Sequence, residues 1–525
     1  MSDRKDKYSI HSTSYTIGQD NIQKWGFDIH NPVFVASAGL VLFFLLATLT
    51  ADAASAKSVL DGIKWQIIST FDLLFVWAGN IFVLFCLALA LSPFGSIRLG
   101  GDAARPKHSR LSWFAMLFAA GMGIGLMFWS VAEPVAYLTA WYKTPLNVEA
   151  NTPEAARLAL GATMYHWGLH PWAIYTLVAL SLAFFSYNKG LPLSVRSIFY
   201  PLFGDKTWGW PGHLVDILAV LATLFGLATS LGLGAQQAAS GMEHVFAIDN
   251  SIGLQITVIV VVTALAVFSV VRGLEGGVKL LSKINMLLAL ALLLFVIFTA
   301  FKVTLGTIPT TLAAYLENII PLSNPHGRND QDWLRSWSVF YWAWWISWSP
   351  FVGMFIARVS EGRTIREFII AVLLVPTLVT TVWISVYGGL AIDQVMKGIG
   401  TLATEGITEV PLAMFQMFEQ LPMSQVISVI AIILVLVFFI TSSDSGSLVI
   451  DNITAGGKIE APAPQRVFWA VTEGVIAATL LWVGGPQAIE ALQAGAISTG
   501  LPFTLVLLLM CVSLIMGLRT ERRPV

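Results

Sequence analysis

Long apolar stretches recur along almost the whole of the 525-residue chain, and they constrain its fold more than any other feature. A helix needs about 20 mostly apolar residues to cross a bilayer, and twelve stretches reach that length. Hydrophobic residues make up 56% of the chain and charged residues only 12%, a balance that soluble domains do not have. The sequence therefore predicts an all-α membrane protein with twelve transmembrane helices. The predicted spans lie near residues 33–51, 66–92, 111–139, 166–187, 210–238, 252–271, 279–301, 334–357, 367–391, 424–449, 465–483 and 499–517.

Basic residues are distributed unevenly between the segments that join these spans. If the N-terminus lies inside, 22 of the 30 Lys and Arg residues fall on the inner side and 8 on the outer side. This asymmetry follows the positive-inside rule and places both termini in the cytoplasm. Residues 1–32 contain no apolar core followed by a cleavage site, so we expect a cytoplasmic tail and not a signal peptide.

The composition argues against several function classes. A net charge of −1 provides no basic surface for nucleic acid. Cys86 and Cys511 are single residues within apolar segments, without the spacing of metal ligands or of a disulfide. The acidic residues of the spans are scattered, which argues against a membrane enzyme, and no filter loop indicates a channel.

Span three contains "FAAGMGIGLMFWSVAEP", in which Gly121, Gly123 and Gly125 occupy every second position. Helix packing is one interpretation, because Gly121 and Gly125 alone have the spacing of a close helix contact. The other is an unwound segment, which membrane proteins tolerate where protein or water covers the backbone. Glu133 closes the motif and is expected to be paired or to lie at the membrane surface.

Span ten contains "FFITSSDSGS", residues 438–447, where five hydroxyl groups and one carboxylate follow an apolar run. A second helix break is one interpretation, because hydroxyl and carbonyl oxygens suit a hard cation such as Na⁺. A polar helix end that reaches the cytoplasm is the other, since Asp451 and Asn452 follow closely. One break early and one late in a chain are typical of the ion sites of inverted-repeat transporters.

Span eight contains "YWAWWISWSP", residues 341–350, with four tryptophans within seven residues. An interfacial belt is the ordinary interpretation of such residues. Trp337 and Trp348 are about 16 Å apart along a helix, however, so the stripe extends deeper than a belt. At helical spacing, Trp342 alone points away from a sector about 100° wide that Trp337, Tyr341, Trp344, Trp345 and Trp348 share. An aromatic face of this kind attracts a quaternary ammonium ion, at about 0.5–1 kcal/mol per exposed ring and more when desolvated.

Span four contributes a second aromatic set in "YHWGLHPWAIY", residues 165–175. Trp167, Trp172 and Tyr175 belong to this set, and Pro171 interrupts the helical hydrogen bonding between them. His166 and His170 are expected to be helix-end or interfacial groups and not proton carriers.

These motifs resemble a known family. The run "FYWAWWISWSPFVGMFIARVSEGRTIREF" resembles the signature of betaine/carnitine/choline (BCCT) transporters, and "GMGIGLMF", "HPWAIY" and "FFITSSDSGS" match at the expected places. The likeness extends from about Asn31 to Arg519. It implies a LeuT-like core of two inverted five-helix repeats, a protein that is commonly a homotrimer, and a place in the bacterial inner membrane.

The resemblance also implies the domain organisation. Residues 1–32 form a cytoplasmic N-terminal tail, and residues 33–95 form two peripheral transmembrane helices. Residues 110–303 hold the first repeat, spans three to seven, and residues 333–518 hold the second, spans eight to twelve. Residues 304–332 form a linker with an amphipathic helix and a periplasmic loop, and residues 519–525 form a short cytoplasmic C-terminus.

The family's substrate site is carried over position by position. The trimethylammonium group would lie among Trp167, Trp172, Tyr175, Trp345 and Trp348, with Trp344 lining a neighbouring part of the pathway. A substrate carboxylate would face the backbone at Gly121, Gly123 and Gly125.

The family's ion sites are carried over in the same way. One sodium site would use the carbonyls of Ala119, Met122 and Phe438 with the hydroxyls of Thr441 and Ser442. A second site would use Thr223 and Phe351. The position one turn after Thr223, a threonine in the family, is Leu227 here, which makes the second site and the ion stoichiometry doubtful.

The resemblance implies a secondary active transporter that works by alternating access, without a bound cofactor. Proton-coupled choline carriers of the family tend to have an acidic residue at the position of Gly125, and glycine leaves room for a ligand with its own carboxylate. Import of glycine betaine with Na⁺ is therefore expected. Choline with H⁺ or Na⁺ is the alternative, because "MFWSVAEPV" is more similar to choline carriers, and ectoine or dimethylsulfoniopropionate would also suit the cage.

Overall fold

The computed structural model describes residues 13–121, 123–272, 275–459 and 462–521. Most of this chain is helical, and one antiparallel hairpin, β1 (Asn21–Lys24) with β2 (Phe27–His30), precedes the helices. Among the described residues, nine helical segments are long and apolar enough to cross a membrane. The predicted fold class, an all-α membrane protein, is confirmed at this level.

The long helices have the following bounds: α1 (Asn31–Thr50), α2 (Ala53–Leu91), α3 (Arg110–Gly121), α4 (Ile124–Thr139), α5 (Pro153–Trp167), α6 (Leu169–Ala183), α8 (Trp210–Phe246), α9 (Ile252–Arg272), α10 (Glu275–Thr299), α11 (Phe301–Ser323), α13 (Val339–Val359), α14 (Ile365–Met396), α17 (Ser424–Thr454), α18 (Ala463–Gly484) and α19 (Ala488–Arg519). Four short helices lie in the connections: α7 (Tyr200–Phe203), α12 (Gln331–Trp333), α15 (Thr401–Thr404) and α16 (Ala413–Phe418).

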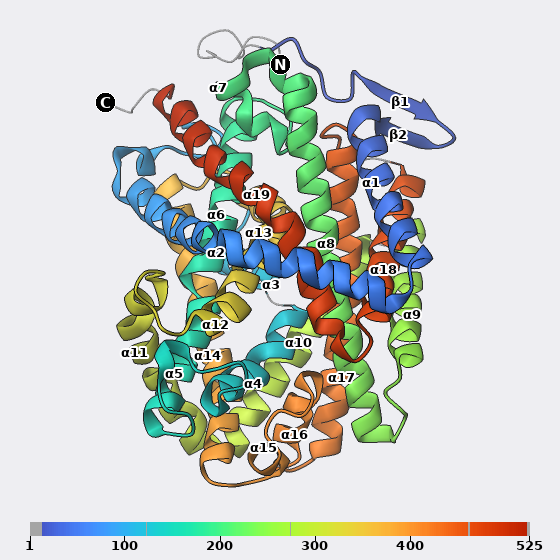
Figure 1. Ribbon diagram of the computed structural model, residues 1–525. Helices are drawn as coiled ribbons and strands as arrows, with labels where there is room; N and C mark the ends of the chain where they lie inside the picture. The colour runs from blue at the N-terminus through green and yellow to red at the C-terminus, as the bar shows by residue number, and fades with distance from the viewer. Residues whose placement is uncertain (1–12, 122, 273–274, 460–461, 522–525) are drawn as a thin grey trace.

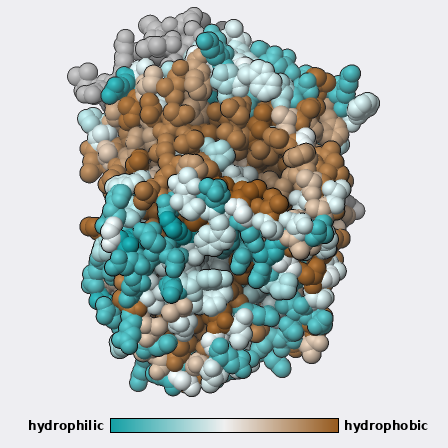
Figure 2. Space-filling model, viewed as in Figure 1, coloured by the Kyte–Doolittle hydropathy of each residue, from teal (hydrophilic) through white to brown (hydrophobic). Residues whose placement is uncertain are grey.

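The helices pack around α13, which has contacts with α6, α8 and α19. Figure 1 shows α2 crossing the front of the bundle obliquely, where it packs on α6 and α19. The β1–β2 hairpin and the C-terminal end of α19 lie at the same end of the molecule (Figure 1). In Figure 2 apolar side chains form a belt across this face, and polar side chains cover the end next to the hairpin and much of the opposite half. This distribution is that of a protein whose middle contacts lipid.

Several helices are longer than the predicted spans. Helix α2 begins at Ala53, 13 residues before the predicted span at 66, because the Asp52 side chain caps it by accepting a hydrogen bond from the Ser55 amide at 2.9 Å. The amphipathic helix expected in the linker at 304–332 is α11, which begins before the linker, at Phe301. Hydropathy detects the part of a helix that contacts lipid, not the polar turns that extend it.

Of the two interpretations left open for span three, the structure shows the interrupted helix. Helix α3 ends at Gly121, α4 begins at Ile124, and Gly123 between them is fully extended, with φ −164° and ψ −166°. A second interruption separates α5 from α6 at Gly168, with φ −99° and ψ −128°. Pro171 then lies in the first turn of α6, where its missing N–H leaves no helical hydrogen bond unmade. The glycine therefore interrupts span four, and the proline does not.

The break considered for span ten is wrong. Helix α17 continues through residues 438–447 without interruption. Its polar groups find partners without unwinding: Thr441 donates to the Val437 carbonyl at 3.0 Å, and Ser443 donates to Glu473 of α18 at 3.1 Å. Asp444 pairs with Arg466, also of α18, at 2.8 Å. Because each of these groups is satisfied by the preceding turn or by α18, the helix has no need to open.

The contact between α13 and α6 depends on Gly353. A methyl group at this position would lie 2.6 Å from Val178 Cγ1 and 3.2 Å from the Ala179 amide nitrogen. We expect Gly353→Ala to cost about 1–3 kcal/mol through overpacking and to lower the Tm of the detergent-purified protein by about 1–3 °C. Gly306→Ala in α11 is the matched control, because nothing lies within 4 Å of that position and alanine is the better helix former. Equal Tm changes in the two variants would contradict this account.

Candidate functional site

The tryptophans of α13 form one stack of rings on the side that faces α4 and α5. Trp344 and Trp345 are parallel, with centroids 4.7 Å apart and an interplanar angle of 13°. Tyr341 continues the stack at 5.8 Å from Trp345. Trp342 points elsewhere, as the helical spacing predicts, and stacks on His170 at 5.0 Å. The stripe is therefore buried within the protein and is not an interfacial belt.

Helices α5 and α6 bring the second aromatic set to the same place. Trp167, the last residue of α5, meets Trp345 edge to face with centroids 4.9 Å apart. Tyr175 of α6 lies 6.3 Å from Trp345, and Trp172 lies 5.5 Å from Tyr175. The interruption at Gly168 allows residues of two helices to face one centre. Together with Trp344 and Trp348, these four residues are called the aromatic cage below.

The extended segment between α3 and α4 provides the remaining wall. Seven residues line a small cavity there: Gly123, Gly125, Leu126, Trp167, Trp344, Trp345 and Trp348. A methyl group at Gly125 would lie 2.9 Å from Trp167 Cη2 and 3.0 Å from Trp344 Cη2, whereas one at Gly123 would lie 3.5 Å from Trp348. In this conformation the two rings therefore occupy the space beside Gly125. Gly121 is the last residue of α3 and is not among these seven.

The cage residues are nearly excluded from solvent, with exposed fractions of 1% to 6%. Desolvation strengthens the attraction between a cation and an aromatic face. The indole N–H groups of Trp344 and Trp348 and the hydroxyl of Tyr175 are buried without a protein partner. A ligand with both a cationic head and an acceptor group would suit such a set of rings and free donors.

The residues suggested as sodium ligands are only partly described. The Thr441 hydroxyl lies 3.2 Å from the Phe438 carbonyl oxygen, so two of the expected ligand atoms are adjacent on α17. Ser442 is half-buried beside them. Ala119 belongs to the last turn of α3, and Met122 lies outside the described residues.

The suggested second sodium site has an apolar residue, Leu227, where an oxygen ligand is expected. Thr223 donates its hydroxyl to the Ala219 carbonyl of its own helix at 2.7 Å. Leu227, one turn later, is fully buried and packs so tightly on α17 that any side chain at Gly446 would overlap it. Phe351 borders Trp348, with ring centroids 5.5 Å apart.

A buried carboxylate, that of Glu133, lies directly behind the cage. The substrate site predicted from the sequence does not include this residue. Glu133 of α4 is fully buried and accepts hydrogen bonds from Trp167 Nε1 at 2.7 Å and from the Tyr341 hydroxyl at 2.6 Å. Its other oxygen contacts the Tyr137 hydroxyl at 2.9 Å and His166 Nδ1 at 2.8 Å. A buried carboxylate is stable only with such partners. The sequence feature that could have indicated this role is an ionisable residue within an apolar segment, since such residues mark functional positions in membrane proteins.

The two histidines lie at helix ends, as expected, His166 in the last turn of α5 and His170 in the first turn of α6, but both are buried and neither is interfacial. His166 is 0% exposed and His170 is 2% exposed. His166 Nε2 hydrogen-bonds the Ser338 hydroxyl at 2.9 Å, and His170 Nε2 hydrogen-bonds Asn80 Oδ1 at 3.1 Å. Helix α5 begins at Pro153, well before the predicted start of span four at residue 166. Because the helix is longer at its N-terminal end, both histidine rings lie inside the bundle.

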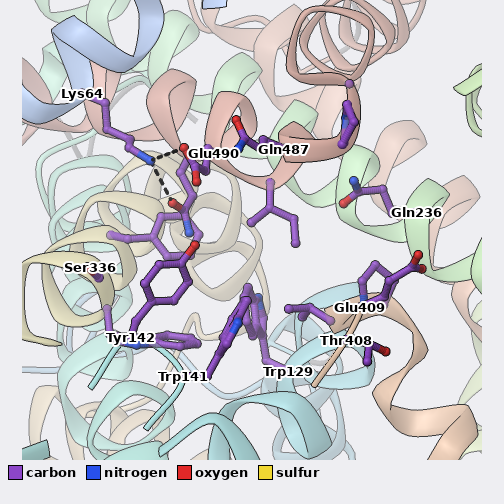
Figure 3. Close-up of a pocket in the computed structure, with 18 of the residues that line it drawn as sticks. Lys64, Trp129, Trp141, Tyr142, Gln236, Ser336, Thr408, Glu409, Gln487 and Glu490 are labelled. Carbon is purple, nitrogen blue, oxygen red and sulfur yellow. Dashed lines mark hydrogen bonds and ion pairs between the residues drawn. The ribbon is translucent and has the colours of Figure 1, made fainter. Parts of the chain in front are cut away.

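A larger cavity of about 460 Å³ is lined in part by the segments that join α4 to α5, α8 to α9 and α18 to α19. Figure 3 shows Lys64 of α2 reaching toward Glu490 of α19, with the rings of Trp129 and Trp141 across the cavity. The Lys64 ammonium lies 3.9 Å from Glu490 and 3.4 Å from Gln493 Oε1. Phe340 also lines this cavity, and its ring stacks on Trp344 at 5.4 Å. A single layer of aromatic rings thus separates the cavity from the cage.

Comparison with known proteins decides the family. The sequence pattern of the betaine/carnitine/choline family transporters matches residues 32–523. The chain belongs to the BCCT family. It is 71% identical over 518 residues, 99% of each chain, to glycine betaine transporter 1 of Vibrio parahaemolyticus serotype O3:K6 (strain RIMD 2210633). A BCCT chain of this kind is a multi-span secondary transporter and not an enzyme.

Two further relatives have related names. The chain is 64% identical to a glycine betaine/proline/choline/ectoine transporter of the same Vibrio strain, covering 98% of this chain and 92% of the relative. It is 41% identical to the glycine betaine transporter OpuD of Bacillus subtilis (strain 168), covering 92% and 95%. The suspected family is confirmed over nearly the whole chain of this BCCT member.

Solvent reaches the large cavity, but not the buried hydrogen-bonded group around Glu133 and His166 behind the cage. Two neighbouring serines test this difference in solvent access. Ser336 lines the cavity, whereas Ser338 is fully buried against His166. We expect Ser336→Cys to react with a membrane-impermeant thiol reagent at least tenfold faster than Ser338→Cys, measured by mass spectrometry of the purified protein. The native Cys86 and Cys511 are buried and should not react. Similar labelling rates at 336 and 338 would contradict the separation of cavity and cage.

Proposed function

We propose that this BCCT member imports glycine betaine together with Na⁺ by alternating access. The observation that carries the proposal is the aromatic cage, six buried rings closed by Gly123 and Gly125. A trimethylammonium group cannot donate hydrogen bonds, so aromatic faces are its best partners. The free indole N–H groups of Trp344 and Trp348 provide donors that a carboxylate can use.

Choline is the second candidate, because two relatives include it in their names. It shares the trimethylammonium group but has a hydroxyl in place of the carboxylate, and it would leave an indole N–H without a charged acceptor. Ectoine and dimethylsulfoniopropionate are further candidates, since both combine a cationic centre with a carboxylate. Glycine betaine is preferred on the grounds of both the cage and the free donors.

Sodium is the proposed coupling ion, with H⁺ as the alternative. The adjacent oxygens of Phe438 and Thr441 support a site on α17, which Ser442, Ala119 and Met122 would complete. Leu227 provides no oxygen where a second site would need one, so we propose one functional Na⁺ site. One Na⁺ that moves down about 100 mV and a tenfold gradient yields roughly 2.3 plus 1.4 kcal/mol, enough to accumulate a zwitterion roughly 500-fold.

The proposal includes the family's architecture. The nine long apolar segments are compatible with twelve spans. Ala463–Arg519 contains two predicted spans, span three is divided between α3 and α4, and the tryptophan-rich α13 is less hydropathic than these nine segments. The two inverted repeats would occupy residues 110–303 and 333–518. We further propose a homotrimer in the bacterial inner membrane with both termini cytoplasmic, so that the large cavity faces the periplasm.

The substrate and the coupling ion are tested together in proteoliposomes. We expect radiolabelled glycine betaine to accumulate when an inward Na⁺ gradient is imposed and not when an H⁺ gradient alone is imposed. Choline should accumulate less under the same Na⁺ gradient. Accumulation of choline with H⁺, and none of glycine betaine, would leave the cage as the binding site but overturn both the substrate and the ion.

The number of sodium sites is tested by two matched substitutions. We expect Thr441→Ala to raise the Na⁺ concentration for half-maximal uptake at least tenfold, because it removes an ion ligand. Thr223→Ala should change it less than threefold, since the Thr223 hydroxyl is bonded within its own helix. A comparable effect of both substitutions would instead indicate that two Na⁺ sites operate despite Leu227.

A further inference from the structure

Glu133 holds two residues of the binding region through one oxygen. Its Oε2 accepts the indole N–H of Trp167 at 2.7 Å and the Tyr341 hydroxyl at 2.6 Å. Tyr341 lies against Trp345, and Trp167 meets both Trp345 and Trp344. Both bonds have the short lengths of charge-assisted hydrogen bonds. The orientation of the two donors therefore depends on the position of a single carboxylate.

The surrounding donors indicate that this carboxylate is ionised. An indole N–H can only donate, and the two tyrosine hydroxyls and His166 Nδ1 can all donate to an anion. Protonated Glu133 would need an acceptor among these four groups and would lose one of its bonds. The side chain is fully buried, so its charge is not screened by water.

The same cluster also holds the third ring of the cage. Trp345 Nε1 donates to the backbone carbonyl of His166 at 2.9 Å. The His166 ring itself is fixed between Tyr341, stacked at 4.6 Å, and Trp333, stacked at 5.4 Å. By contrast, the indole N–H groups of Trp344 and Trp348 have no protein partner. Glu133 and His166 thus hold Trp167 and Trp345 in place, and they leave the indoles of Trp344 and Trp348 free to meet a ligand.

We propose that Glu133 is a positioning and specificity residue of the cage: it fixes the rings of Trp167 and Tyr341, and its buried charge favours ligands with a net positive charge. An anion that accepts an indole N–H bond increases electron density on that ring and strengthens its attraction to a cation. The charge acts more on choline, a net cation, than on a zwitterion whose carboxylate it also repels. This inference rests on the proposed function, because it concerns the same site.

The test separates the hydrogen bonds from the charge. Glu133→Gln retains an oxygen acceptor for Trp167 and Tyr341 but removes the charge, whereas Tyr341→Phe removes one donor and keeps the charge. Dissociation constants for choline and glycine betaine are measured by calorimetry in detergent at saturating Na⁺, and KM and maximal rate are measured in proteoliposomes. We expect Glu133→Gln to raise the Kd for choline at least tenfold and that for glycine betaine about threefold. Tyr341→Phe should raise both by the same factor.

In both variants KM should rise by the same factor as Kd, since a positioning role acts on binding. Glu473→Gln is the matched control, because Glu473 is another fully buried carboxylate, on α18, that accepts a hydrogen bond from Ser443 and not from a cage residue. Both Kd values should stay within twofold in that variant.

The outcomes distinguish this inference from the proposed function. If the wild-type protein binds neither ligand, the proposed function fails. If it binds them and Glu133→Gln changes neither Kd, or changes both equally, the specificity role of Glu133 is overturned. If Glu133→Gln does not fold, Tyr341→Phe decides the positioning role: a uniform rise in Kd supports it, and unchanged values overturn it.

Discussion

The contact between the extended glycine segment and the tryptophans of α13 is the interaction on which the rest of the site depends. Backbone that leaves the helix within a membrane exposes polar groups that lipid cannot satisfy, so protein must cover it. Here the indole rings of Trp344, Trp348 and Trp167 cover the segment at Gly123 and Gly125. Only glycine allows this approach, because a side chain at Gly125 would collide with two rings. The break and the cage are therefore one structural unit.

This unit explains why a carboxylate is buried among aromatic rings. Rings that pack edge to face can tilt, and a cage requires a fixed arrangement. Glu133 fixes it through Trp167 and Tyr341, and His166 extends the same network to Trp345. The desolvation of the carboxylate is offset by four hydrogen bonds. The cluster lies on three segments, α4, α5 and α13, so movement of any one of them relative to the others would change the cage.

Alternating access requires that such a site be open to one side at a time. The large cavity next to Trp129 and Phe340 approaches the cage, and one aromatic layer separates the two. Halfway along α8, Leu227 packs tightly on Gly446 of α17. The interruptions at Gly123 and Gly168 provide backbone that can adjust when the aromatic layer moves.

The sequence by itself determined the membrane class, the transporter family and the separate face of Trp342, because hydropathy, motif and helical period are local properties of the chain. It also located the break at Gly121–Gly125. Tertiary structure decided the rest. Helix α17 stays intact because α18 and the preceding turn satisfy its polar groups. Gly168, and not Pro171, interrupts span four. Glu133 and His166 became a buried cluster only when α4, α5 and α13 met, and no spacing along the chain encodes contacts between residues 33 to 208 positions apart.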